Sequence, residues 1–303
     1  MSPVRRRHKK SPRYLEDLTY SVAEGGIAPE NPFVAQDLFL GRYNESQVME
    51  KLAGVGMIDL LKSRGYNDLV VQIFRQDGFT SRFYVNFGSP GSSTRLIELV
   101  VREGVFRPTE TFIPGYDFSD GLAMLLIEWM ALQDPRASFS RERPRLPGQQ
   151  YPGLGGLKKM QALLYELGKE TGKEAIVDVP EYFHAAAIYS RLYTEIYDRK
   201  YAFFSPIDAG IMNAILRDVC VEPRGLADVS FAIAFDCLLD GKTLKPVTWR
   251  SSEQVYPISN RLQRYIDDER YKRIVHKTME ERSFAMDWER YDKIKERGLL
   301  DAL

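Results

Sequence analysis

Apolar residues recur along this chain with two different periods, and the order of these periods predicts its elements. Steps of three and four residues indicate helices, whereas alternation and short apolar runs indicate strands. The first two thirds of the chain predict a helix, four strands, a long connection, and then helix, strand and helix. These elements span residues 46–64, 69–75, 82–87, 95–102, 123–132, 157–167, 175–179 and 182–193.

Turn residues mark several of these boundaries. Asp77-Gly78 separates the first two strands and is a hairpin signal. Gly65 and Gly172 follow two of the helical patterns, where a left-handed cap is expected. Pro180 ends the strand before the last helix of this series.

The final third of the chain predicts an extension of this core. A helix is expected at 207–219, a strand at 229–235, its hairpin partner at 244–249, and charged helices with solvated faces over 259–297. Residues 1–13 are strongly basic and contain little that is apolar, so they predict a disordered tail. We therefore divide the chain into an N-terminal segment (1–35), a core (36–200) and a C-terminal extension (201–303).

Composition narrows the possible functions. Lys plus Arg equals Asp plus Glu, at 42 each, so no global field favours nucleic acid or a membrane surface. No apolar run approaches the roughly 20 residues of a membrane span. The two cysteines and three histidines lack the spacing of a zinc site. Cys220 and Cys237 lie in apolar stretches, which indicates buried thiols in a reducing cytoplasm.

The stretch from Pro147 to Gly156 brings glycines to the start of a predicted helix. Gly153, Gly155 and Gly156 remove side chains where free N–H groups and the helix dipole attract an anion such as a pyrophosphate. The alternative is that these glycines have only a structural role, in a loop that turns the chain into the helix. A dinucleotide-binding fold fits less well, because about five elements precede the glycines. No Walker Lys-Ser/Thr follows them either.

The residues around these glycines resemble the GNAT superfamily of acyl-CoA-dependent N-acetyltransferases. The signature of that family, Gln/Arg-x-x-Gly-x-Gly/Ala, follows a strand and opens a helix. This chain has Gln150-Tyr151-Pro152-Gly153-Leu154-Gly155, and Pro147 lies three residues before the Gln, where the family commonly has a proline. The connection from 133 to 149 is longer than the short loop that is usual there.

The resemblance continues through the following helix, strand and helix. The last helix of the family often reads Asn-x-x-Ala-x-x-x-Tyr-x-x-x-Gly-Phe, and Ala185 and Tyr189 match it. Tyr182 replaces the Asn, and Tyr193-Thr194 replaces the Gly-Phe. The resemblance assigns residues 122–194 to the acyl-CoA-binding half of the fold.

The resemblance implies an α+β fold, with a mixed and mostly antiparallel sheet flanked by helices. It implies acetyl-CoA or a longer acyl-CoA as co-substrate. The backbone of Gly153, Leu154, Gly155 and Gly156 would bind the CoA pyrophosphate, and Gln150 would help to hold the loop.

Catalytic candidates follow from the same resemblance. A strand N–H between residues 123–132 and 175–179 would polarise the thioester carbonyl. Tyr189 stands where family members often carry a tyrosine that protonates the departing thiolate, although one more buried aromatic is the alternative. Glu128, in an apolar strand that would raise its pKa, is the first candidate for the general base, and a structural ion pair is its alternative. Glu181 and His184 are further candidates.

Three functions remain open from the sequence. The first is an N-acyltransferase acting on an unknown amine. The second is a GNAT-like domain that binds without catalysing, which the departures in the last helix favour. The third is a nucleic-acid-associated protein that uses the basic tail and the arginines of the long connection, and we rank it last because aromatics are scarce there. The acceptor and the oligomeric state stay open.

Overall fold

A seven-stranded mixed sheet forms the centre of the computed structural model, which describes residues 38–75, 77–194, 199–221 and 223–302. In spatial order its strands are β1 (Leu69–Arg75), β2 (Thr80–Phe87), β3 (Arg95–Phe106), β4 (Leu122–Leu132), β5 (Ala175–Asp178), β10 (Gln254–Pro257) and β8 (Ala202–Phe203). Neighbouring strands are antiparallel, except β4 and β5, which are parallel. This arrangement confirms the predicted α+β class with a mostly antiparallel sheet.

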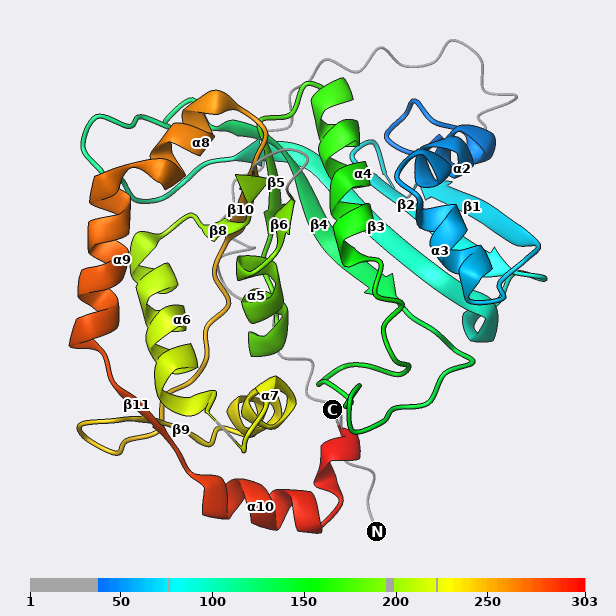
Figure 1. Ribbon diagram of the computed structural model, residues 1–303. Coiled ribbons are helices and arrows are strands. Elements are labelled where there is room, and N and C mark those ends of the chain that lie inside the picture. Colours follow the sequence, from blue (N-terminus) through cyan, green and yellow to red (C-terminus); the bar gives the residue numbers. More distant parts are fainter. Residues whose placement is uncertain (1–37, 76, 195–198, 222, 303) are drawn as a thin grey trace.

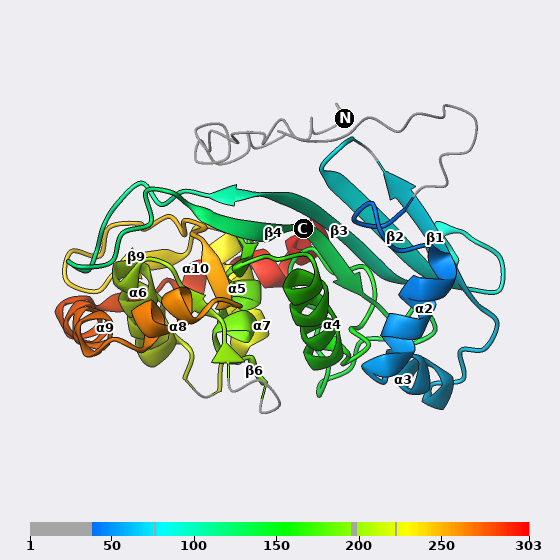
Figure 2. The same cartoon turned by 90° about the horizontal axis from the view of Figure 1, so that it is seen from above.

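Four helices lie along one side of the sheet, as Figures 1 and 2 show. They are α2 (Glu45–Gly54), α3 (Met57–Ser63), α4 (Leu157–Glu170) and α5 (Phe183–Ser190). Helix α4 is the crossover between the parallel strands β4 and β5, and α5 follows β5 directly. Strands β4 and β5 and helices α4 and α5 are therefore consecutive in the chain and meet in one region of the sheet.

The C-terminal third is mainly helical and lies beside α5 (Figure 1). Its helices are α6 (Pro206–Val219), α7 (Leu226–Ala234), α8 (Asn260–Asp267), α9 (Glu269–Glu281) and α10 (Trp288–Glu296). Two small sheets pair β9 (Leu238–Asp240) with β11 (Phe284–Met286) and β6 (Tyr193–Thr194) with β7 (Arg199–Lys200). Short 3-10 helices occur at Ser92–Thr94 and Leu299–Ala302.

Both faces of β5 and of β4 up to Ile127 are buried, which explains why this part of the sheet is almost continuously apolar. On the helix side, Leu125 and Ile127 belong to the main core together with the inward face of α4, whose 3–4 spacing gave the prediction. On the other side, Met124 and Val177 pack with residues of α8 and of the β3–β4 connection. The inward residues of α4 are Met160, Leu163, Leu164 and Leu167.

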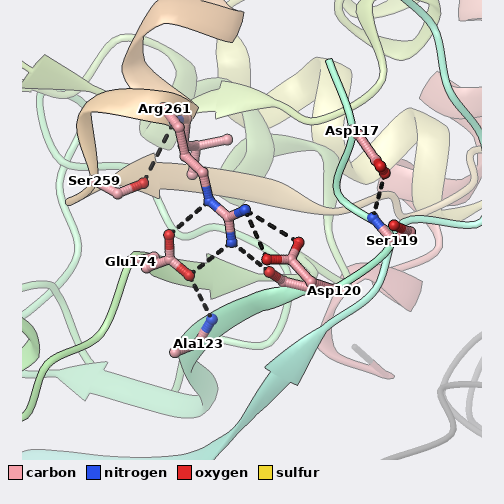
Figure 3. A network of polar contacts seen from close by, with 9 residues as sticks. Asp117, Ser119, Asp120, Ala123, Glu174, Ser259 and Arg261 are labelled. Atoms are coloured by element: carbon pink, nitrogen blue, oxygen red, sulfur yellow. Dashed lines mark hydrogen bonds and ion pairs between the residues drawn. The ribbon is translucent and has the colours of Figure 1, made fainter. Parts of the chain in front are cut away.

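A single guanidinium ties the C-terminal extension to the starts of β4 and β5 (Figure 3). Arg261 of α8 donates to both carboxylate oxygens of Glu174, at 2.7 and 2.9 Å. It also donates to Asp120 at 3.1 Å and to the carbonyl of Gly121 at 2.6 Å. Glu174 in turn accepts the Ala123 N–H at 3.3 Å. The clamp fixes the spacing of β4 and β5 at the end opposite to the site.

Two local predictions in the extension are wrong. The segment predicted as a strand at 229–235 lies in helix α7. Apolar or small residues cover most of this helix, so the alternation of apolar residues in its sequence does not distinguish a strand from a helix. The predicted partner at 244–249 forms only an isolated bridge between Leu239 and Pro246. The segment that does enter the main sheet is β10.

The predicted helix at 46–64 is two helices, α2 and α3. Gly56 lies between them with a φ of 72°, a left-handed conformation that ends one helix and redirects the chain into the next. The charged region at 259–297 forms the expected helices, with β11 between α9 and α10.

Some expectations lie outside the described residues, namely the basic tail at 1–13 and the N-terminal segment to residue 35. Within the part of the chain that the structure describes, no helix is long and apolar enough to cross a membrane.

Candidate functional site

The glycine loop runs back along the end of β4 before it enters α4. The Leu154 N–H donates to the carbonyl of Leu132 at 3.0 Å, and the Asp134 N–H donates to the carbonyl of Pro152 at 2.8 Å. The side chain of Leu154 is fully buried in the main core. These contacts hold the loop in one position, so the N–H of Leu154, a predicted cofactor contact, is already used.

The glycines of the loop serve different purposes. Gly155 is exposed and has a φ of 71°, which favours a residue without a side chain. Gly156 is buried, and a Cβ there would lie 2.8 Å from Cε of Met57 in α3. Gly156 therefore allows α3 to pack closely against the start of α4.

The first turn of α4 presents N–H groups without acceptors. Gly156 precedes the helix as its cap residue and makes no side-chain cap. Among the described residues, none accepts a hydrogen bond from the N–H groups of Gly155, Gly156, Leu157 or Lys158. Together with the dipole of a 14-residue helix, these groups favour an anion.

Cationic side chains surround this helix start. Arg64 lies beside Gly155 and pairs with Asp134 at 3.1 Å. Arg143 donates to the carbonyl of Gly153, and Arg136 stacks on the ring of Tyr66 at 4.8 Å. Although burial disfavours the charge, hydrogen bonds from Tyr66 and Arg64 lower the pKa of Asp134. With Lys158 and Lys159 in the first turn of α4, positive charge exceeds negative charge around the loop.

The role expected of Gln150 belongs to its neighbour. Gln150 is exposed, and no described residue bonds to its side chain. The Oε1 of Gln149 accepts the Leu146 N–H at 3.2 Å, and its carbonyl accepts from Arg145 at 3.0 Å. Gln149 therefore orders the connection that leads to the glycines.

Strands β4 and β5 separate midway along β4. Their ladder ends where Ile127 pairs with Asp178, and β4 continues alone to Leu132. Backbone groups alternate sides along a strand, and the carbonyl of Leu132 faces away from β3 towards Leu154. The N–H of Met130, two residues earlier, therefore also faces the side that β5 has left.

A β-bulge lies at the point of separation. Val100 pairs with Trp129 and Val101 pairs with Ile127, so Glu128 is the extra residue of β4. The bulge turns Glu128 to the exposed face of the sheet, where it forms an ion pair with Arg102. The apolar surroundings expected for Glu128 are not present, because Glu128 and the next residue, Trp129, are both exposed, whereas Ile127 is buried in the main core.

A buried acid pair occupies the end of β5. Asp178 is the last residue of β5, and its carboxyl meets the Val179 N–H and the hydroxyl of Tyr189 in α5. Burial raises the pKa of Asp178 to about 7. Burial and the charge of Asp178 raise the pKa of Tyr189 well above its usual value. Each residue keeps only 8% of its surface exposed, so the pair is largely shielded from solvent.

Asp178 is not among the candidates predicted from the sequence, although the sequence carries a signal for it. A carboxylate inside the apolar run Ala175–Val179 is unusual, because Asp is seldom buried without a partner. Tyr189, the predicted acid, is the residue that the structure brings to it. A buried carboxyl with a pKa near neutrality beside a tyrosine is suited to proton transfer.

The other proposed bases lie in different surroundings. His184 is buried, its Nδ1 lies 2.9 Å from Oγ of Ser230, and burial lowers its pKa to about 4. His184 is therefore a neutral core residue. Glu181 is exposed at the start of α5.

Other features do not add to the site. A shallow groove of about 460 Å³ lies elsewhere, between α2 and the edge strand β1. The described part of the chain contains no cluster of His, Cys, Asp and Glu that could hold a metal ion. Compared with known protein families, curated proteins and solved structures, the chain matches none. The chain is thus an α+β protein in which the start of α4 favours an anion and a buried acid pair lies on the same diverging strand pair.

Proposed function

We propose that this protein is an N-acyltransferase that transfers an acyl group from acetyl-CoA or a longer acyl-CoA to an amine. The observation that carries the proposal is the placement of two features along β4. The glycine loop bonds to Leu132, and Asp178 pairs with Ile127, five residues earlier. That separation is roughly 17 Å along a strand, a length that the extended pantetheine arm of CoA spans.

Each part of the cofactor then has a partner of matching chemistry. The pyrophosphate accepts hydrogen bonds from the free N–H groups of Gly155–Lys158, and Arg64 adds positive charge. The pantetheine arm follows the side of β4 that β5 has left. The Met130 N–H faces this side and donates to a carbonyl of the arm, about 7 Å along β4 from Leu132, and the arm continues to the thioester beside Asp178. Tyr189 protonates the departing thiolate, as the resemblance implies.

We also propose a cytoplasmic location, because Cys220 and Cys237 are free thiols, as is usual in a reducing compartment.

A specific observation favours a second candidate, a domain that binds without catalysing. Tyr182, at the position where the family often has Asn, packs against the connection before the glycine loop. A Cβ on Gly148 would lie 2.9 Å from the Tyr182 ring. The ring therefore occupies space between the start of α5 and this connection, and we infer that it reduces the room for an acceptor.

Calorimetric titration of two variants tests the cofactor site. Asn and Asp both tolerate the left-handed conformation of Gly155, have nearly the same size, and differ in charge. Gly155→Asp should lower the affinity for acetyl-CoA by at least about tenfold relative to Gly155→Asn, because a carboxylate faces the pyrophosphate. Equal affinities in both variants, or no binding of any CoA species by the wild type, would refute the proposal. Binding without turnover across amines would favour the second candidate.

A further inference from the structure

Buried oxygen atoms gather around Asp178 on the helix side of the sheet. Gln254 of β10 is the cross-strand partner of Asp178, so both side chains lie on the same face. Its Nε2 donates to the carbonyl of Ala186 at 3.1 Å and to Oγ of Ser190 at 2.8 Å, which fixes the orientation of the amide. The Oε1 of Gln254 is buried and accepts from no described residue.

Tyr201 supplies a second unpartnered oxygen. Its side chain is 1% exposed, and its hydroxyl has no partner among the described residues. Its ring centroid lies 5.0 Å from that of Tyr189 and 5.2 Å from that of Tyr256. The Tyr201 ring thus packs on Tyr189, whose hydroxyl meets Asp178, and we group these oxygens as one cluster.

This group has acceptors and aromatic rings but no cation. No lysine or arginine among the described residues contributes to the electrostatics of Asp178. A buried carboxylate without a cation is unfavourable. An ammonium group offers three donors and a positive charge, and aromatic faces attract such a cation. The chemistry of the group is therefore complementary to an ammonium ion.

We propose that Asp178, Gln254 and Tyr201 bind the ammonium group of the acyl acceptor, and that this acceptor is a primary aliphatic amine on an unbranched chain. The proposal rests on the proposed acyltransferase function. Asp178 and Tyr189 are buried, and each keeps 8% of its surface. So little exposed surface favours a slender unbranched chain over a bulky acceptor. An α-amino acid is disfavoured, because its carboxylate would approach Asp178.

The same residues complete the proton balance of the transfer. The carboxylate of Asp178 takes a proton from the ammonium, which leaves a neutral amine. The amine nitrogen attacks the thioester carbon, so a C–N bond forms and the C–S bond breaks. The thiolate takes the Tyr189 proton, and Tyr189 regains one from the Asp178 carboxyl. The second proton of the amide nitrogen leaves to solvent, so the products are an amide, CoA thiol and one released proton.

Binding of n-butylamine to the full chain, saturated with CoA so that no turnover occurs, tests this site. Wild type should show saturable binding, whereas n-butanol, which lacks the charge, should not bind. Asp178→Asn should weaken the amine about tenfold or more, and Tyr201→Phe should weaken it by a smaller factor. The control Asp59→Asn, at an exposed position in α3, should leave the affinity unchanged.

Turnover then identifies the source of the amine. Both n-butylamine and a lysine-containing peptide carry the proposed group, and the lower KM shows whether a small amine or a protein side chain is the acceptor. Wild type that binds CoA but not n-butylamine, or Asp178→Asn that binds the amine as wild type does, would overturn the proposal. If wild type does not bind CoA but binds n-butylamine in a manner that depends on Asp178, the acyltransferase function would be refuted and the ammonium site would still be supported.

Discussion

Replacement of Asp178 by Asn should stabilise the protein, and the gain should grow with pH. The folded pKa of Asp178 is raised to about 7 from an ordinary value of 3.8, because burial disfavours the charged form. The folded protein therefore keeps a proton that the unfolded chain releases. The stability that comes from the neutral carboxyl is complete below pH 3.8 and is lost as the pH rises to about 7.

The size of the effect follows from the shift. About three pKa units correspond to about 4 kcal/mol, which is the cost of ionising Asp178 in the fold at high pH. Asn imitates the neutral carboxyl and keeps groups for the Val179 N–H and the Tyr189 hydroxyl. The advantage of Asp178→Asn over wild type should therefore increase by up to about 4 kcal/mol between about pH 4 and about pH 8.

Urea unfolding across this pH range measures the effect. The slope against urea should be the same for both proteins, so that midpoints report stability. His184 titrates in the same range, but both proteins contain it and its contribution cancels in the difference. An advantage that stays constant with pH, or one that shrinks as the pH rises, would refute the account of Asp178.

The remaining predictions concern three other residues. His184→Gln should remove a pH dependence of the opposite sign, because burial lowers the pKa of His184 from 6.5 to about 4. As the pH falls through this range, urea unfolding should show wild type losing about 3 kcal/mol of stability relative to the variant. Arg261→Ala should destabilise the protein by about 1–2 kcal/mol, because it removes the hydrogen bonds to Glu174, Asp120 and the Gly121 carbonyl, whereas exposed Arg264→Ala should change the unfolding midpoint little. Tyr189→Phe should lower kcat by about 100-fold with little change in the KM for acetyl-CoA; an unchanged kcat would contradict the role of Tyr189 as an acid.

Long elements with one buried face were predictable from the sequence. The apolar face of α4 and the β-branched runs of β1 to β4 each have a clear period, and the structure has them within a few residues. Helix α7 was not predictable in this way, because residues such as Val229 and Phe231 are buried on all sides and show no distinguishing period. The break at Gly56 was hidden because α2 and α3 continue the same apolar spacing.

One part of the candidate site could be predicted from the sequence, and the other could not. The free N–H groups at the start of α4 were predictable, because they depend only on the glycines and on the helix that follows them in the sequence. The base was not, because its properties depend on contacts distant in sequence. A bulge decides that Glu128 faces solvent, and the packing of α5 and β10 decides that Asp178 does not. Tyr201 and Gln254 join Asp178 only through the sheet order, which no local pattern reveals.

Hydrogen exchange at the start of α4 tests the central claim most directly. The N–H groups of Gly155 to Lys158 have no acceptor among the described residues and should exchange rapidly in the free protein. Saturating CoA should slow exchange of a peptide that covers them by about tenfold or more, because the pyrophosphate accepts their hydrogen bonds. Unchanged exchange at these amides, with CoA bound elsewhere or not at all, would contradict the account.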